Sequence, residues 1–175
     1  MMRCLDKGGI KAYYDVNHIV KEGTNKYGSY EVPLSESKGT HAYDTRWQSM
    51  FNHPGRAVKI LCHKMMHVPA LKPYRVIIML RDPNHIYKSY MRAWGKQYTW
   101  VMKDAEAIKK PGTYHKLMID LILKCHSMEN IEFVTMSYDQ VVQNPLKQFK
   151  LIEALSWEID AEKAVEGVDA EEKHF

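Results

Sequence analysis

Apolar residues recur along the chain in two different periods. Three short runs, at residues 57–61, 75–80 and 131–136, consist mainly of β-branched and other apolar residues. Runs of this length and composition are typical of strands that are buried in a parallel sheet. A fourth run, at residues 10–14, is a weaker strand candidate. The pattern therefore predicts three strands and leaves a fourth open near the N-terminus.

Helices are predicted between and after these runs. One apolar stripe at helical spacing separates the second and third runs and consists of Tyr114, Leu117, Met118, Leu121, Ile122 and Cys125. Asp82-Pro83 and Asn144-Pro145 each place a capping residue before a proline at the first helical position, and a short helix is expected after Asp160. The alternation of strands and helices predicts an α/β fold in which residues 1–175 form one domain, a three-layer structure whose mainly parallel sheet has helices on both faces.

Composition narrows the class of protein. The formal net charge of +4 favours anionic ligands in a general way. No run approaches eighteen apolar residues and the first six residues lack a secretory signal, so we expect a cytoplasmic protein with no membrane partner. The three cysteines form no CxxC pair, and His63 and His67 have no evident third ligand, so no metal site is predicted.

Two residues that suit a phosphate follow the second strand. Ligands of parallel sheets bind at the carboxyl ends of the strands, where Arg81 is expected. Ser89 comes eight residues later, about two turns into the following helix. A guanidinium fork, a hydroxyl and a helix N-terminus together favour an anion. The residues alone also allow an ion pair of Arg81 with Asp82 or Asp139, an ordinary surface position for Ser89, and a core or interface position for the aromatic ring of Tyr138.

The sequence from Arg81 to Ser89, Arg-Asp-Pro-Asn-His-Ile-Tyr-Lys-Ser, resembles a motif of the sulfotransferase family. Residues 133–145 are similar to the same family's strand, Tyr-Glu-Asp-Leu segment and Asn-Pro helix start, and weaker likenesses lie at 25–31 and 168–171. The resemblance implies that Arg81 and Ser89 bind the 3'-phosphate of 3'-phosphoadenosine 5'-phosphosulfate, the sulfuryl donor, and that Tyr138 lies near its adenine.

The resemblance also implies a P-loop NTPase-like fold that lacks its first strand and its P-loop. Residues 1–10 look like the second half of the helix that follows this loop, with Gly8 or Gly9 ending it. The implied activity is transfer of a sulfuryl group to a hydroxyl or amine of a small-molecule or glycan acceptor. The alternative is a non-catalytic remnant that serves as a nucleotide-binding or assembly module, with a homo-oligomer or a completing chain as partner.

The general base is the least defined part of the predicted site. In the family a Lys-Thr-His triplet near a strand end supplies a lysine and the base. Here His63 stands four residues after Lys59 instead of two, and these are the catalytic candidates. The basic and aromatic stretch 87–96 could suggest nucleic acid, but its aromatic residues recur at helical spacing, which favours a packed helix, so no nucleic-acid partner is predicted.

Overall fold

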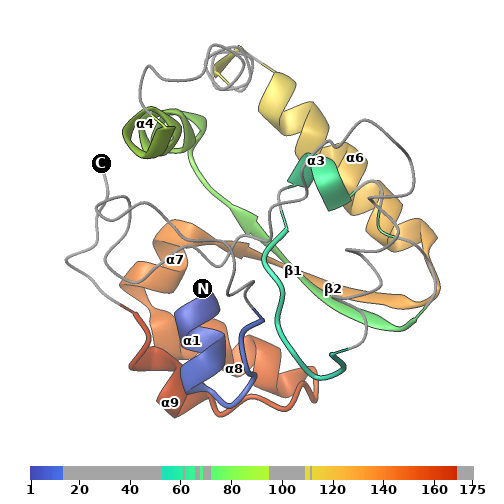
Figure 1. Cartoon of the computed structure of the whole chain (residues 1–175), viewed down its shortest axis with the longest axis vertical. Helices are drawn as coiled ribbons and strands as arrows, with labels where there is room; N and C mark the ends of the chain where they lie inside the picture. Colours follow the sequence, from blue (N-terminus) through green and yellow to red (C-terminus); the bar gives the residue numbers. More distant parts are fainter. Residues whose placement is uncertain are drawn as a thin grey trace. The chain divides into compact units, whose positions relative to one another are not determined.

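The structure, a computed structural model, describes residues 1–13, 53–60, 62–65, 68, 72–94, 109–110 and 112–168. The chain divides into two units: unit 1 comprises Met1–Leu61 and Asn144–Asp169, and unit 2 comprises Cys62–Gln143 and Ala170–Phe175. The described residues form a mixed helix and strand structure with a small parallel sheet, which is compatible with the α/β class (Figure 1). The finer prediction of one three-layer domain stays a prediction.

The sheet of unit 2 consists of β1 (Tyr74–Leu80) and β2 (Ile131–Ser137). The strands are parallel and in register from the pair Tyr74 and Ile131 to the pair Leu80 and Ser137, which confirms two of the predicted strands. One register pair is more exposed than a fully buried sheet would allow: Arg75 and Glu132 lie opposite each other, and Arg75 Nε is 3.5 Å from Glu132 Oε2. Because both side chains are about half exposed, this ion pair contributes little to stability.

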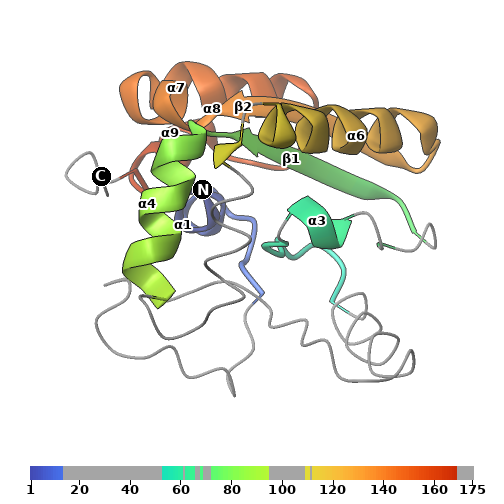
Figure 2. The same ribbon diagram turned by 90° about the horizontal axis from the view of Figure 1, so that it is seen from above.

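Helix α6 (Thr113–Ser127) packs against β2 and against α3 (Cys62–Met65). Figure 2 shows α6 lying alongside the two strands. Its apolar stripe was predicted from the spacing of the residues, and four of its members are buried, namely Tyr114, Met118, Leu121 and Cys125. Burial of the Cys125 thiol raises its pKa, because the thiolate would lose hydration in the core. The stripe is therefore the core-facing side of this helix, as predicted.

Each strand of the sheet runs into a helix. Helix α4 (Pro83–Trp94) follows β1, and Asp82 Oδ1 accepts hydrogen bonds from the backbone N–H groups of Asn84 at 2.7 Å and His85 at 3.4 Å. The predicted cap is confirmed, and the hydrogen bond from Asn84 is the main cause of the lowered pKa of Asp82. Helix α7 (Tyr138–Gln143), which the sequence pattern did not predict, follows β2.

Unit 1 begins with helix α1 (Met2–Lys7). Its end has the hydrogen bonds of a Schellman motif, because the Gly9 N–H donates to Asp6 O at 3.2 Å and the Ile10 N–H donates to Leu5 O at 2.8 Å. Gly9 has φ +100°, a conformation that glycine adopts without the steric cost of a side chain. The predicted stop of this helix at Gly8 or Gly9 is confirmed.

Two further helices complete the described core of unit 1. Helix α9 (Ala161–Val165) packs against both α1 and α8 (Pro145–Ala154), as Figure 1 shows. The apolar residues buried in this unit come from all three helices, from the segment after α1 and from the α8–α9 connection: Met2, Cys4, Leu5, Ala12, Phe149, Ile152, Trp157, Ile159, Ala161 and Ala164. The helix starts predicted at Asn144-Pro145 and after Asp160 are confirmed, but the side chain of Asn144, the predicted capping residue, forms no capping hydrogen bond.

The two remaining strand candidates meet in unit 1, where their described residues, 10–13 and 57–60, form no regular strand. Ala12 and Ala57 pair through an isolated parallel bridge, in which the Tyr13 N–H donates to Ala57 O at 2.8 Å and the Ala57 N–H donates to Lys11 O at 2.9 Å. The expectation of a buried strand is wrong for residues 57–60, where Lys59 is exposed and its neighbours are only half-buried. Residues 25–31, which carry one of the weaker family likenesses, lie outside the described residues.

The cap of α9 gives a prediction about pH. Asp160 Oδ1 accepts from the Lys163 N–H at 3.0 Å, and Asp160 Oδ2 lies 2.8 Å from Lys163 Nζ. The side-chain and backbone hydrogen bonds of Lys163 lower the pKa of Asp160 from 3.8. A carboxylate with a lowered folded-state pKa stabilises above its unfolded pKa, and this contribution is lost as the pH falls through the folded value.

We therefore expect Asp160→Ala to lower the melting temperature at pH 7 and to have a smaller effect below about pH 4. Thermal unfolding followed by circular dichroism between pH 7 and pH 3 measures this. Glu153→Gln, at an exposed position on α8, is the matched control. A destabilisation by Asp160→Ala that is the same at pH 7 and pH 3 would contradict the role of the ionised carboxylate.

Candidate functional site

Two of the predicted site residues meet at the carboxyl edge of the sheet. Arg81 directly follows β1 and Tyr138 directly follows β2, and the last residues of the two strands, Leu80 and Ser137, are register partners. Because the strands are parallel and in register, the next residue of each emerges at the same edge. The guanidinium carbon of Arg81 lies 4.5 Å from the centroid of the Tyr138 ring, within the range of a cation–π interaction.

A second tyrosine reaches the same point from helix α6. The Arg81 backbone N–H donates to the Tyr114 hydroxyl oxygen at 3.0 Å. Tyr114 is 9% exposed, and its burial raises the pKa of the hydroxyl above 10.0, so this group is protonated at neutral pH. Tyr114 was predicted only as a member of the apolar stripe of this helix. The available signal was its polar tip, since a buried tyrosine hydroxyl needs a partner.

Helix α4 contributes Ser89, the third predicted residue of the donor site. Ser89 is half-buried and lies on the same helical face as His85, because the two are four residues apart. His85 is half-buried as well and lies one turn closer to the sheet edge, and the sequence analysis did not single it out. His85 could have been predicted from its position four residues before Ser89, on the same face of the helix. A contact of Ser89 with a ligand of Arg81 stays a prediction.

An ionised carboxylate, that of Asp82, directly follows Arg81 at the start of α4. The Asp82 carboxylate is held by the first backbone amides of α4, and its pKa is lowered, so it is ionised at neutral pH. Arg81 Nε and Nη2 are buried, whereas Asp139 in the first turn of α7 is exposed. Burial makes a guanidinium a stronger partner for an anion than it would be in water, because water screens the charge less.

The catalytic candidates lie in different units of the chain. Lys59 is an exposed residue of unit 1. His63 belongs to α3 in unit 2, and the structure describes its backbone but not its side chain. Their roles therefore stay predictions. Within the described ranges, no three His, Cys, Asp or Glu side chains gather in a way that could hold a metal ion.

No protein-family model, curated protein or solved structure matches this chain. The family resemblance therefore rests on the sequence motifs alone. Among the described helices, none is both long enough and apolar enough to span a membrane. The function is best argued from the residues at the carboxyl edge of the sheet.

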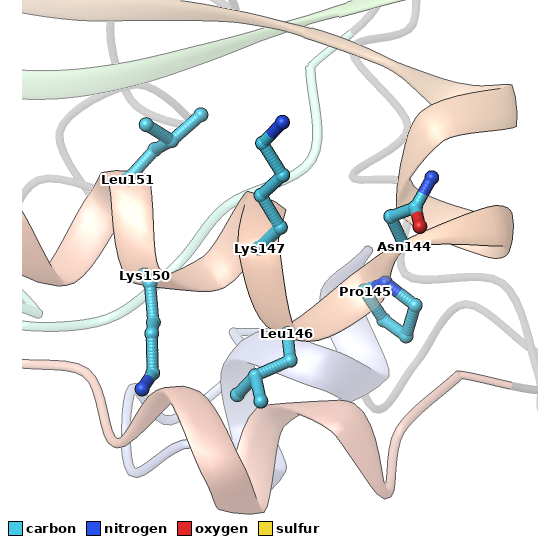
Figure 3. Close-up of a pocket in the computed structure, with 6 residues that line it drawn as sticks. All are labelled: Asn144, Pro145, Leu146, Lys147, Lys150 and Leu151. Atoms are coloured by element: carbon cyan, nitrogen blue, oxygen red, sulfur yellow. The ribbon is translucent and has the colours of Figure 1, made fainter.

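Unit 1 has a shallow depression that the sequence analysis did not predict. It has a volume of about 610 Å³ and is lined by Asn144, Pro145, Leu146, Lys147, Lys150 and Leu151. All six residues belong to α8 or to its cap, and Figure 3 shows Lys147 and Leu151 pointing to one side of the helix and Leu146 and Lys150 to the other. Side chains that diverge in this way do not converge on one small ligand, so the depression is a weaker candidate than the edge of the sheet.

Proposed function

We propose that the chain is a cytoplasmic sulfotransferase-like protein with a P-loop NTPase-like, three-layer fold, and that unit 2 holds the donor nucleotide. In this proposal Arg81 and Ser89 bind the 3'-phosphate of 3'-phosphoadenosine 5'-phosphosulfate, and Tyr138 lies beside the adenosine. The observation that supports it is the meeting of Arg81 and Tyr138 at the carboxyl edge of a parallel sheet, because two separate motifs predicted these residues for one ligand.

The chemistry of the proposal is an in-line transfer. The acceptor hydroxyl or amine attacks the sulfur atom of the donor, the bond from sulfur to the bridging phosphate oxygen breaks, and adenosine 3',5'-bisphosphate leaves. The acceptor proton goes to a base, for which His63 and Lys59 are the candidates. Like phosphoryl transfer, this reaction depends on positioning and on stabilising the charge of the leaving oxygen. Arg81 contributes by fixing the far end of the nucleotide.

Calorimetric titration of the 175-residue chain with adenosine 3',5'-bisphosphate tests the donor site. We expect Arg81→Ala to weaken binding about 10- to 100-fold, since a hydrogen bond to a charged group contributes about 1.5–3 kcal/mol. Affinity for adenosine 5'-phosphate, which lacks the 3'-phosphate, should change much less. The matched control is Arg75→Ala, which removes an exposed arginine from β1 and should leave both affinities unchanged.

Two results would overturn the proposal: failure of the unaltered chain to prefer the bisphosphate to adenosine 5'-phosphate, or equal effects of Arg81→Ala and Arg75→Ala. Transfer of labelled sulfate from the donor to a panel of hydroxyl and amine acceptors then separates an enzyme from a nucleotide-binding module. Binding without transfer would favour the non-catalytic alternative.

A further inference from the structure

The hydroxyl of Tyr114 is placed to do more than complete a helix face. It stands at the start of α6, in the buried stripe, and its oxygen accepts the N–H of the first residue after β1 at 3.0 Å. This hydrogen bond joins the helix to the point where Arg81 leaves the sheet. A phenylalanine would fill the same core position, so the hydroxyl itself requires an explanation.

A tyrosine hydroxyl both accepts and donates hydrogen bonds. One lone pair of the Tyr114 hydroxyl oxygen accepts the Arg81 N–H, which is the hydrogen-bond partner of this oxygen within the described part of the chain. The hydroxyl proton can therefore turn toward an acceptor at the same edge of the sheet. Since burial raises its pKa, Tyr114 keeps this proton throughout the neutral range.

We propose that Tyr114 is a third residue of the phosphate site, where its hydroxyl accepts the Arg81 N–H and donates its proton to the phosphate monoester that the Arg81 side chain binds. This inference rests on the proposed function. Its ligand is the 3'-phosphate of an adenosine nucleotide, and Tyr114 both positions Arg81 and contacts the anion.

The two tyrosines act on different parts of Arg81. The hydroxyl of Tyr114 fixes the backbone of Arg81, and the ring of Tyr138 lies under its guanidinium at 4.5 Å. Fixing both ends of the side chain reduces the rotamer entropy that binding would otherwise cost. A guanidinium held in this way is preorganised for a planar, two-pronged contact with a phosphate.

Tyr114→Phe tests the inference, because it removes the hydroxyl and keeps the ring. We expect binding of adenosine 3',5'-bisphosphate to weaken about 10-fold, and the affinity for adenosine 5'-phosphate to stay within about 2-fold of its original value. The reason is that the hydrogen bond from the neutral hydroxyl to the charged 3'-phosphate is lost, and only the bisphosphate has this phosphate. Tyr87→Phe is the matched control, a half-buried tyrosine of α4 whose ring contacts Lys109 Nζ at 4.2 Å. Both variants are measured by calorimetry after circular dichroism has shown that they are folded.

A second measurement covers the case in which Tyr114→Phe does not fold. The full chain with 3-fluorotyrosine at position 114 alone is titrated with the same two nucleotides, and its fluorine resonance should shift with the bisphosphate and stay in place with adenosine 5'-phosphate. Equal shifts, or equal affinities of Tyr114→Phe and Tyr87→Phe for the bisphosphate, would overturn the role of Tyr114 while the effect of Arg81→Ala remained. If the unaltered chain shows no preference for the bisphosphate, the proposed function fails and this inference with it.

Discussion

Gly167→Ala is expected to destabilise unit 1 by about 3 kcal/mol or more. A Cβ atom at this position would lie 2.5 Å from Cys4 Cα, 2.6 Å from Cys4 N and 2.9 Å from the carbonyl carbon of Arg3. All three are backbone atoms of α1, which cannot move aside as a flexible side chain can. The Gly167 carbonyl also accepts from Arg3 Nε at 2.8 Å, so a shift of the chain here would break a second contact. Urea unfolding of the purified variant measures the loss.

The control for this substitution is Gly55→Ala, in the same unit. Gly55 has φ +75°, but a Cβ atom there would meet nothing within 4 Å. Only the strain of the left-handed conformation is expected, about 1–2 kcal/mol. If the two variants lose the same free energy of unfolding, the close approach of residue 167 to α1 is not what constrains this glycine.

Local signals in the sequence were enough to predict most of the regular structure. The cap at Asp82, the helix start after Asp160 and the stripe from Tyr114 to Cys125 all depend on residues a few positions apart, and the structure has them as expected. The strand β2 was equally clear from its apolar run. Such features are determined by helix and strand periods and by short-range hydrogen bonds, which can be read without knowledge of the tertiary fold.

Helix α7 was missed although a local signal for it exists. Ser137 precedes this helix, and its Oγ accepts from the Gln140 N–H at 3.5 Å, the position that a capping serine bonds. In the sequence these residues belong to the motif segment between β2 and α8, for which no helix was predicted. A short helix has too few residues for a convincing apolar period, so its cap was the better indicator.

Long-range contacts explain what could not be predicted. The Arg3 side chain meets Gly167 at a separation of 164 residues, and the Arg81 N–H meets Tyr114 at a separation of 33. No periodicity encodes such pairs, because they depend on which faces of distant elements come together. The predicted site shows the same division: the strand-end positions of Arg81 and Tyr138 came from the sequence, whereas the contact between their side chains came from the parallel register of the sheet.

Phe149→Ala is the second substitution for which we expect a large loss in the free energy of unfolding. Phe149 lies on α8, is 0% exposed and is among the largest fully buried side chains in the described part of the chain. Removing a buried aromatic ring loses its transfer free energy and leaves a cavity, together about 3–5 kcal/mol. We expect a loss of this size in urea unfolding, with a lower midpoint and an unchanged dependence on urea concentration.

Leu151→Ala provides the comparison that shows whether burial of the ring causes this loss. Leu151 lies on the same helix but is 49% exposed, so its truncation should cost well under about 1 kcal/mol. Both substitutions introduce alanine, so helix propensity cannot produce the large difference between them. If Phe149→Ala lowers the free energy of unfolding as little as Leu151→Ala does, α8 does not pack in unit 1 as described. Removing a phenyl ring from a close-packed core costs more than truncating an exposed leucine.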